Sequence, residues 1–406
     1  MDSQQARPQH QLLRSPEELQ GFAHDLANTP PEPLAVDTER ASGIHYDDRA
    51  FLIQVNSDEL GTQLVDPDAH RDQVGEILGR EFNKREWVLH DATGDLPCLA
   101  WLGLYPAKLF DTQLAAALAG QSKLSLIGLT EDLLGIEISK NHQAENWSVR
   151  PIPESWLRYA AADVDNLLDI AGILEEILDS QGRLEWLEQE CEHRRLMFAD
   201  VDSPTPRTLE QAKGYTRIRH GKQRAVFKAI WEDREEEARS RDVAPTRILS
   251  DRVLAQVAEA TPKTYREFEK IVKPAGRRPG RNVTVPNMAQ VRRWWEAIER
   301  AYKAGSKSWP GPVAVDYGSG TYPPKNRNWQ QDDPESYEAF QEVSERRNEL
   351  AQDLGIDPAL ILGTKPLAMI VWRLSQGEGG VEELMDGRDM RPWQKDLMRP
   401  ILAEEF

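Results

Sequence analysis

The stretch "LAVDTER", residues 34–40, is a short apolar run that ends on two carboxylates, Asp37 and Glu39. Residues two apart in a β-strand lie on the same face, so a strand here would point both acids in the same direction. Like charges at this separation repel each other, and that repulsion has to be offset. The pattern alone fits either a divalent cation held by the pair or a strand end that is open to water.

Further apolar runs typical of strands follow, separated by polar, turn-rich stretches. The predicted strands are 34–37, 50–56, 63–65, 86–90 and 107–112. The short connections between the first three predict an antiparallel meander. Helical patterns then alternate with the later strands, and this order indicates an α/β domain.

The composition describes a globular chain. Of the 406 residues, 39% are hydrophobic and 29% are charged, which is typical of folded rather than disordered proteins. No apolar run is long enough to span a bilayer, and the polar start "MDSQQARPQHQLLRSPEEL" lacks the apolar core of a signal peptide. Cys98 and Cys191 are far apart and have no metal-ligand spacing. We therefore predict a cytoplasmic protein with no membrane partner.

Charge divides the chain into three parts, although the net charge is −18. Residues 1–205 hold 16 basic and 37 acidic side chains, residues 206–310 hold 24 and 13, and residues 311–406 hold 10 and 18. A basic middle part can bind phosphates while the whole molecule stays acidic. Charge and the Pro- and Gly-rich connections together predict domains at 1–205, 206–308 and 336–406, with a linker at 309–335.

Two more motifs carry acids that could join the first pair. Asp95 lies in "LHDATGDL" after the fourth predicted strand, and "RYAAADV" places Tyr159 and Asp163 four residues apart on one helix face. Taken alone, Asp95 fits a helix N-cap, and the second motif fits an ordinary amphipathic helix. Carboxylates from separate elements are also what hard cations such as Mg²⁺ prefer. A pair of such ions can clamp the attacking and leaving oxygens of a phosphoryl displacement.

These motifs occur together in one order, and in that order they resemble a known family. The set "AVDTE", "LHDATGDL", "LFDTQLAAAL" and "NWSVRPIPESWLRYAAADVDNLL" closely resembles ribonuclease D, a 3′–5′ exonuclease with an Asp-Glu-Asp-Asp set and a Tyr-x-x-x-Asp third motif. The resemblance runs through about residues 15–200. It implies an α/β ribonuclease H-like exonuclease domain, in which a mixed sheet with three antiparallel strands is flanked by helices.

The resemblance also implies roles for individual residues. Asp37, Glu39, Asp95 and Asp163 match the metal ligands of the family, which holds two divalent ions, Mg²⁺ or Mn²⁺. Tyr159 matches the group that orients the water nucleophile. The joint match of all five favours a nuclease site over the separate structural interpretations.

Other positions are predicted to support the site or to bind substrate. Asp111, in "FDTQ", matches a recurrent family position and could support the site or cap the helix that follows. Lys140, Trp147 and Arg150 precede the third motif and are candidate contacts to the nucleotide or phosphate, although Trp147 also fits a core or hinge position.

The chain departs from the family pattern at two points. Arg40 stands where an aromatic residue often follows the first-motif Glu, and Gly94 stands where Glu commonly precedes the second-motif Asp. Neither change removes a ligand. Both bear on how the 3′-terminal nucleotide is held.

The rest of the chain is predicted to be helical. Residues 217–271 resemble an HRDC domain, a compact helical bundle associated with nucleic-acid binding, and the region from 336 resembles a second, divergent copy. The first bundle carries many cations, and we predict that these contact nucleic acid. Adjacent Trp294 and Trp295 fit its core better than a base-stacking surface. The cations are Arg217, Arg219, Lys222, Arg224, Lys228, Arg277, Arg278, Arg281, Arg292 and Arg293.

Together these features predict a metal-dependent 3′–5′ exoribonuclease. It would trim single-stranded 3′ ends of tRNA precursors or other structured RNA and release nucleoside 5′-monophosphates. Two alternatives are a 3′–5′ DNA exonuclease that acts in repair and a catalytically silent adaptor that only binds nucleic acid.

Overall fold

The computed structural model describes residues 10–137, 145–273, 286–311, 323–324 and 326–406. The N-terminal α/β domain is built on one six-stranded sheet with the order β1-β4-β3-β2-β5-β6. The strands are β1 (Gln11–Leu13), β2 (Leu34–Arg40), β3 (Ala50–Ser57), β4 (Gly61–Val65), β5 (Glu86–Leu89) and β6 (Lys108–Asp111).

The sheet is mixed, as the resemblance implied. Strands β2, β3 and β4 form the antiparallel meander, while β5 pairs in parallel with both β2 and β6. In the β2/β3 pair, Asp37 lies opposite Gln54 and Glu39 lies opposite Leu52, and the register shifts between Glu39 and Arg40. Strand β1 was not predicted; its three residues pair in parallel with β4, about 50 residues downstream.

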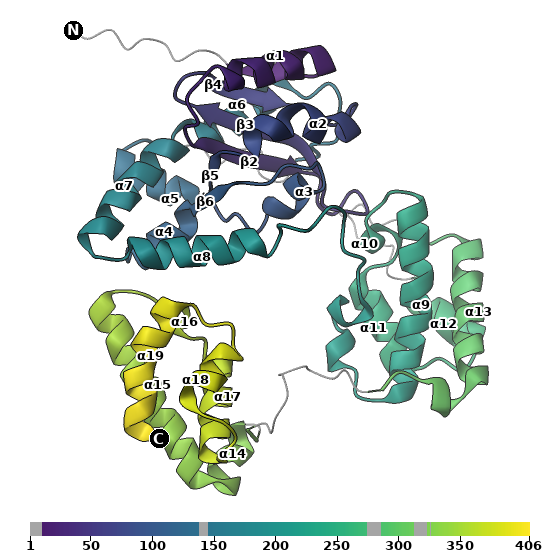
Figure 1. The fold of residues 1–406 in the computed structure, drawn as a ribbon. Coiled ribbons are helices and arrows are strands. Elements are labelled where there is room, and N and C mark those ends of the chain that lie inside the picture. Colours follow the sequence, from purple (N-terminus) through teal and green to yellow (C-terminus); the bar gives the residue numbers. More distant parts are fainter. Residues whose placement is uncertain (1–9, 138–144, 274–285, 312–322, 325) are drawn as a thin grey trace.

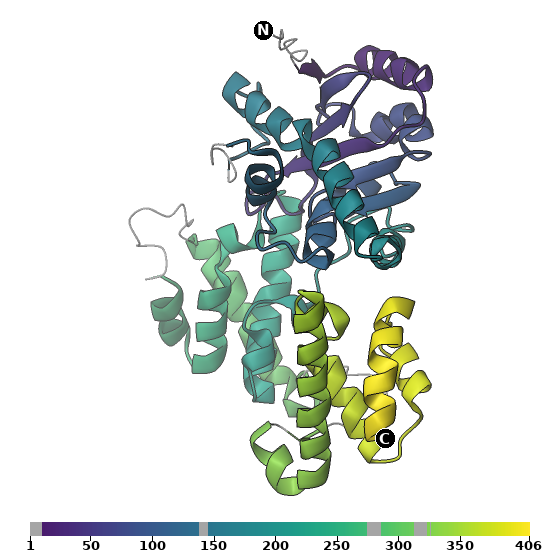
Figure 2. The same cartoon turned by 90° about the vertical axis from the view of Figure 1, so that its left-hand side faces the viewer.

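Helices cover both faces of the sheet (Figures 1 and 2). On one face, edge-to-face aromatic contacts join Phe22 of α1 to Phe82 of α2, and Phe82 to Trp87 of β5. On the other face, Ala35 and Val88 pack with apolar residues of α6 and α7. The helices of this domain are α1 (Pro16–Ala27), α2 (Arg71–Phe82), α3 (Leu96–Ala100), α4 (Thr112–Leu118), α5 (Leu126–Leu129), α6 (Glu154–Asp165), α7 (Leu167–Ser180) and α8 (Leu184–Leu196).

Helix α6 lies against the strands that carry the first motif. It contacts β2, β3 and β4. Ala160 and Ala161 are buried in this contact together with Leu52 and Leu64 of the sheet. Alanine side chains let a helix approach a sheet closely, so the polar residues on the neighbouring face of α6 are brought close to β2.

The first helical module, residues 221–304, has its own core. Trp294 is fully buried and Trp295 nearly so, which confirms their prediction as core residues. Arg224 is also buried and donates to the backbone carbonyls of Ile218, Arg219 and Pro310, so this member of the predicted basic cluster is structural. The module contains α9 (Gly221–Ser240), α10 (Pro245–Ile248), α11 (Asp251–Ala260), α12 (Tyr265–Val272) and α13 (Met288–Ala304).

The second helical module, residues 326–405, contacts the α/β domain through α8. Trp393 stacks on Trp186 of α8 with ring centroids 4.8 Å apart, and Arg391 Nε donates to Glu190 Oε1 over 2.7 Å. Its first helix lies inside the range predicted as a linker, where buried Trp329 packs on Phe340. The helices are α14 (Asn326–Asp332), α15 (Pro334–Leu354), α16 (Pro358–Ile361), α17 (Thr364–Ser375), α18 (Val381–Asp386) and α19 (Pro392–Glu405).

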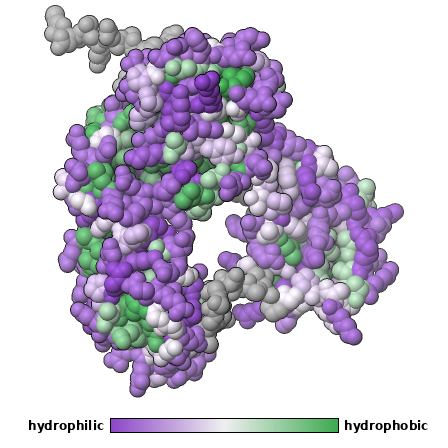
Figure 3. All heavy atoms as spheres, viewed as in Figure 1, coloured by the Kyte–Doolittle hydropathy of each residue, from purple (hydrophilic) through white to green (hydrophobic). Residues whose placement is uncertain are grey.

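The face of the molecule in Figure 3 is largely hydrophilic, with apolar side chains in small separate patches. Within the described part of the chain, every helix is too short or too polar to cross a bilayer. Both cysteines are buried and free.

The first helical module is bonded to the loop that follows β2. Asp242, at the end of α9, accepts a hydrogen bond from Arg49 Nη2 over 2.5 Å and from the Tyr46 amide over 3.3 Å. His45 Nδ1 lies 2.8 Å from the same carboxylate. These bonds lower the pKa of Asp242 well below its usual range, chiefly through Arg49. The module is thereby connected to the strand of the first motif.

We predict that Asp242→Asn loosens this contact. The amide keeps the shape of the side chain but loses the charge-assisted bonds, which contribute about 1–2 kcal/mol at a half-exposed position. The Ala244 amide donates to the Ile44 carbonyl across the same contact. Its hydrogen exchange should therefore become about tenfold faster.

The matched control is Asp389→Asn. Asp389 has the same left-handed backbone, with φ of 54° against 48° for Asp242, but its carboxylate lies 3.5 Å from His193 and is highly exposed. Equal Ala244 exchange in wild type and Asp242→Asn would show that the carboxylate does not hold the module. Because the pKa of Asp242 is lowered, wild-type protection should persist at neutral pH and be lost only as the pH falls below about 4.

Candidate metal centre of the α/β domain

Three of the predicted ligands meet at the contact between β2 and α6. Asp37 and Glu39 point from the same face of β2, as their spacing predicted, and Asp163 approaches from α6. One carboxylate oxygen from each of the three lies within 4.8 Å of the others. All three side chains are half-buried.

The cluster is electrostatically strained. Burial, together with the neighbouring acids, raises the pKa of Glu39 to about 10 and raises that of Asp37 well above its usual range. Burial raises the pKa of Asp163 to about 7, partly offset by a hydrogen bond from Tyr159. The three groups can be ionised together near neutral pH only if positive charge is supplied to them.

Tyr159 lies one helical turn before Asp163 and is hydrogen-bonded to it. Burial, with the nearby acids, raises the pKa of the tyrosine hydroxyl above its ordinary value of 10. The hydroxyl therefore keeps its proton at neutral pH and acts as a hydrogen-bonding group rather than as a base.

Asp95, the fourth predicted ligand, lies beside the three-acid group. It is 4% exposed and accepts a 2.5 Å hydrogen bond from Thr38 Oγ1, while Arg40 Nη2 lies 3.7 Å from its carboxylate. Burial raises its pKa to about 6, with Arg40 acting in the opposite direction. Asp95 is not one of the three acids whose oxygens lie within 4.8 Å of one another, but its charge adds to the effect of burial in raising the pKa of Asp37.

Arg40 and Gly94, the two positions that differ from the family pattern, contact each other. Arg40 Nη1 donates to the Gly94 carbonyl over 2.7 Å. A Cβ atom at Gly94 would lie 3.1 Å from Arg40 Nη2, so the glycine leaves room for the guanidinium. The sequence separated these residues by more than 50 positions, and only the structure shows that they form one feature beside Asp95.

Asp111 performs both of the roles proposed for it. Its buried carboxylate accepts from the amides of Gln113 and Leu114 and so caps α4. It also accepts from the amides of Asp91 and Ala92, which precede Asp95. Asp111 is therefore a support for the second motif.

The structure gives two of the predicted substrate contacts a different role. Trp147 is 1% exposed and packs edge-to-face on Trp156, so it belongs to the core, as its alternative interpretation stated. Arg150 forms two 2.7 Å bonds to Asp66 and also donates to the Phe51 carbonyl, so its guanidinium ties the third-motif segment to the sheet. Lys140 lies outside the described residues.

The acid cluster fits divalent cations. Its donors are all carboxylate oxygens, which Mg²⁺ and Mn²⁺ prefer. Asp37, Glu39 and Asp163 form the group that could hold a cation, and Asp95 lies outside this group of three. Burial is the main cause of the raised pKa of each of the three acids, and neighbouring acids add to it for Asp37 and Glu39.

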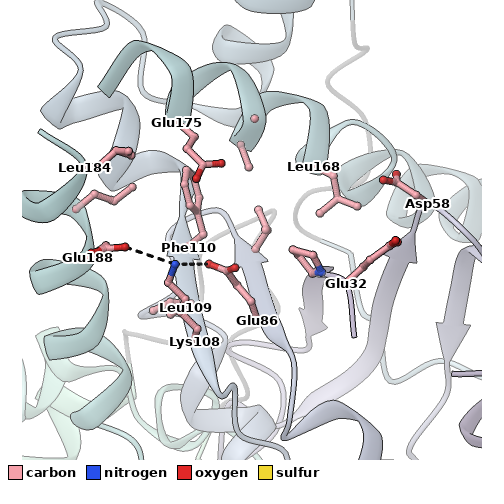
Figure 4. Close-up of a pocket in the computed structure, with 15 residues that line it drawn as sticks. Glu32, Asp58, Glu86, Lys108, Leu109, Phe110, Leu168, Glu175, Leu184 and Glu188 are labelled. Atoms are coloured by element: carbon pink, nitrogen blue, oxygen red, sulfur yellow. Dashed lines mark ion pairs between the residues drawn. The ribbon is translucent and has the colours of Figure 1, made fainter. Parts of the chain in front are cut away.

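A separate cavity lies at the other ends of the parallel strands (Figure 4). Its volume is about 260 Å³, and Glu86 of β5 and Glu188 of α8 flank Lys108 of β6 at 3.6 Å each. Glu32 and Glu175 add further acids to its wall. Phosphate groups would be repelled from this cavity, so we do not place RNA there.

Comparisons with known proteins match the three parts of the chain. A family model described as 3′–5′ exonuclease matches residues 11–179, and the HRDC domain model matches residues 223–279. A model described as 3′ to 5′ exonuclease C-terminal domain matches residues 322–406. A ribonuclease D of Gluconacetobacter diazotrophicus is 31% identical over 261 residues, which are 63% of this chain and 64% of that protein.

In sequence the chain is similar to ribonuclease D of several bacteria. This confirms the resemblance found in the first, second and third motifs. The match to the curated relatives is partial, since it spans 64% of the Gluconacetobacter protein and 65% of a ribonuclease D of Nitrobacter hamburgensis, which is also 31% identical.

Solved structures extend the likeness along the whole chain. A protein of Bifidobacterium adolescentis is 26% identical with a TM-score of 0.82, covering 99% of this chain and 97% of that one. Escherichia coli RNase D is 20% identical with a TM-score of 0.69, covering 98% and 99%. The ribonuclease D fold, an exonuclease domain followed by helical modules, is therefore confirmed.

The raised pKa values predict how stability depends on pH. A carboxyl whose pKa is raised on folding binds a proton that the unfolded chain has already released, so the free energy of unfolding decreases as the pH rises. For Glu39 this range extends from about 4.5 to about 10. Without divalent cations, the Tm of wild type should therefore fall between about pH 6 and about pH 9.

Glu39→Gln should make the Tm depend less on pH. The control is Glu59→Gln, the same change at an exposed position, which should leave the dependence of Tm on pH as in wild type. Differential scanning calorimetry at low salt with EDTA makes the measurement. Parallel pH profiles of wild type and Glu39→Gln would contradict the electrostatic strain described here.

Proposed function

We propose that the chain is a 3′–5′ exoribonuclease that depends on two divalent ions, Mg²⁺ or Mn²⁺. Its substrates would be the single-stranded 3′ ends of tRNA precursors or other structured RNA, and its products nucleoside 5′-monophosphates. The observation that carries the proposal is the convergence of three carboxylates within 4.8 Å, beside Tyr159, in a domain matched by a 3′–5′ exonuclease model.

Each residue of the site has a part in this proposal. The divalent cations, when bound, supply electrostatic stabilisation of the charge that develops on the phosphate and on the leaving 3′ oxygen. Asp37, Glu39, Asp95 and Asp163 hold them. Tyr159 keeps its proton and orients the water that attacks the terminal phosphodiester, since its hydroxyl lies at the edge of the acid cluster.

The first helical module supplies a surface for the body of the RNA. Arg292 is exposed on it, and Arg217 and Arg219 are exposed directly before its first helix. Lys228 is also exposed but is paired with Glu232. Cations of this kind neutralise phosphates without reading the sequence. Arg293 is committed to Asp233 and Glu237 and so contributes less.

End-labelled RNA with an unpaired 3′ tail tests the activity. With Mg²⁺ or Mn²⁺, wild type should shorten the RNA one nucleotide at a time, and EDTA should stop the reaction. Asp37→Ala should lower kcat at least about 10³-fold because a ligand is lost, and Tyr159→Phe about 10²-fold because the water is no longer oriented. Gel analysis of the products and chromatography of the released mononucleotides give the measurements.

Tyr337→Phe, in the second helical module, is the matched control for Tyr159→Phe and should retain wild-type kcat. A DNA strand of the same sequence at the same salt concentration serves as the comparison substrate. Faster shortening of DNA would favour the DNA exonuclease. RNA binding without shortening, with either metal, would favour the silent adaptor.

The RNA-binding surface gives a separate prediction. Arg217→Gln with Arg219→Gln should weaken RNA binding and reduce the dependence of log K on log salt by about 1.4, since each contact to single-stranded RNA contributes about 0.7. Fluorescence anisotropy between about 50 and about 200 mM salt makes the measurement.

The control removes two exposed cations from the second module, Lys365→Gln with Arg399→Gln, and should leave the salt dependence unchanged. If the slope of log K against log salt is unchanged in the Arg217/Arg219 variant, the RNA binds to another surface of the protein.

A further inference from the structure

Gln54 is a buried polar residue beside the metal centre that the motifs did not indicate. It lies in the middle of β3, directly opposite Asp37 across the β2/β3 pair, and it is 0% exposed. Residues opposite each other in an antiparallel pair project from the same face, with Cβ atoms about 5 Å apart. The amide of Gln54 therefore shares the face of the first-motif acids, under α6.

Apolar side chains lie next to Gln54 on its face of the sheet. Leu52 lies two residues before it on the same face, and Leu64 lies opposite it on β4. Both leucines pack with Ala160 and Ala161 of α6. Within the described residues, neither Oε1 nor Nε2 of Gln54 has a hydrogen-bond partner. An unpaired amide in such a place destabilises the fold and calls for an explanation.

Asn56, two residues along the same strand and on the same face, shows the usual arrangement. Its Nδ2 donates to Thr62 Oγ1 over 2.6 Å, and Thr62 in turn donates to Asp165 over 2.5 Å. Asn56 is half-buried and its amide is paired within the protein. Gln54 is fully buried, its amide has no partner among the described residues, and the strand register sets it opposite Asp37.

We propose that Gln54 is a positioning residue of the metal centre, and that its Nε2 donates to the Asp37 carboxylate when cations are bound. The inference rests on the proposed function in that the acid cluster holds divalent cations. A carboxylate has more lone pairs than one cation uses, and a hydrogen bond to the remaining oxygen fixes its orientation, as partners behind metal ligands do. The unpaired amide lowers the stability of the metal-free protein, and it stabilises the metal centre when cations are bound.

Gln54→Leu and its matched control Asn56→Leu separate this role from a structural one. Two measurements are made on each variant: Mn²⁺ affinity by isothermal titration calorimetry, and Tm in EDTA by calorimetry. Gln54→Leu should bind Mn²⁺ about tenfold more weakly, while its metal-free Tm should equal or exceed that of wild type. Asn56→Leu should show the reverse, a lower Tm with unchanged Mn²⁺ affinity. In the RNA assay, Gln54→Leu should lower kcat and leave KM unchanged.

Unchanged Mn²⁺ affinity in Gln54→Leu overturns the proposal, and so does a metal-free Tm that falls as far as that of Asn56→Leu. Gln54→Met provides a second, unbranched replacement if the leucine variant does not fold. Asp37→Asn in the same titration reports on the proposed function itself. If wild type and Asp37→Asn bind Mn²⁺ equally, the metal centre is absent, whereas a defect in Asp37→Asn without one in Gln54→Leu rejects only the role of Gln54.

Discussion

The crowding of three half-buried carboxylates at one place is the constraint on which the rest of the site depends. Asp37 and Glu39 leave the same face of β2, and Asp163 meets them from α6 with oxygens within 4.8 Å. Burial and proximity both disfavour the ionised forms, which is why the pKa of Glu39 rises to about 10. A fold keeps such an arrangement only where it gains function, since replacing the acids by apolar residues would relieve the strain.

The surrounding packing holds this arrangement in place. Ala160 and Ala161 bring α6 close to the sheet. Arg150 then ties the segment before α6 to Asp66 with two 2.7 Å bonds. Because the helix and the strands are held by contacts outside the acid cluster, the cluster cannot relax by moving apart.

Local patterns predicted the parts of the site that depend on periodicity. A spacing of two residues in a strand predicted that Asp37 and Glu39 share one face of β2. A spacing of four residues in a helix predicted that Tyr159 and Asp163 share one face of α6. Contacts between distant residues could not be predicted in this way. Arg150 could have bound a phosphate, and only the fold brings it to Asp66, 84 residues away. Strand β1 was missed because three residues carry too little pattern to indicate pairing with β4. Gln54 was missed because its meaning depends on the register that sets it opposite Asp37.

The helical modules are bonded to the elements that carry the motifs. Asp242 of the first module binds the loop that directly continues β2. The second module binds α8 through Glu190, and four residues further along that helix Arg194 reaches Asp111, whose carboxylate orders the loop before Asp95. Three hydrogen bonds thus lie between the second module and the loop before Asp95. The two helical modules therefore contact the α/β domain close to the loops that carry the first and second motifs.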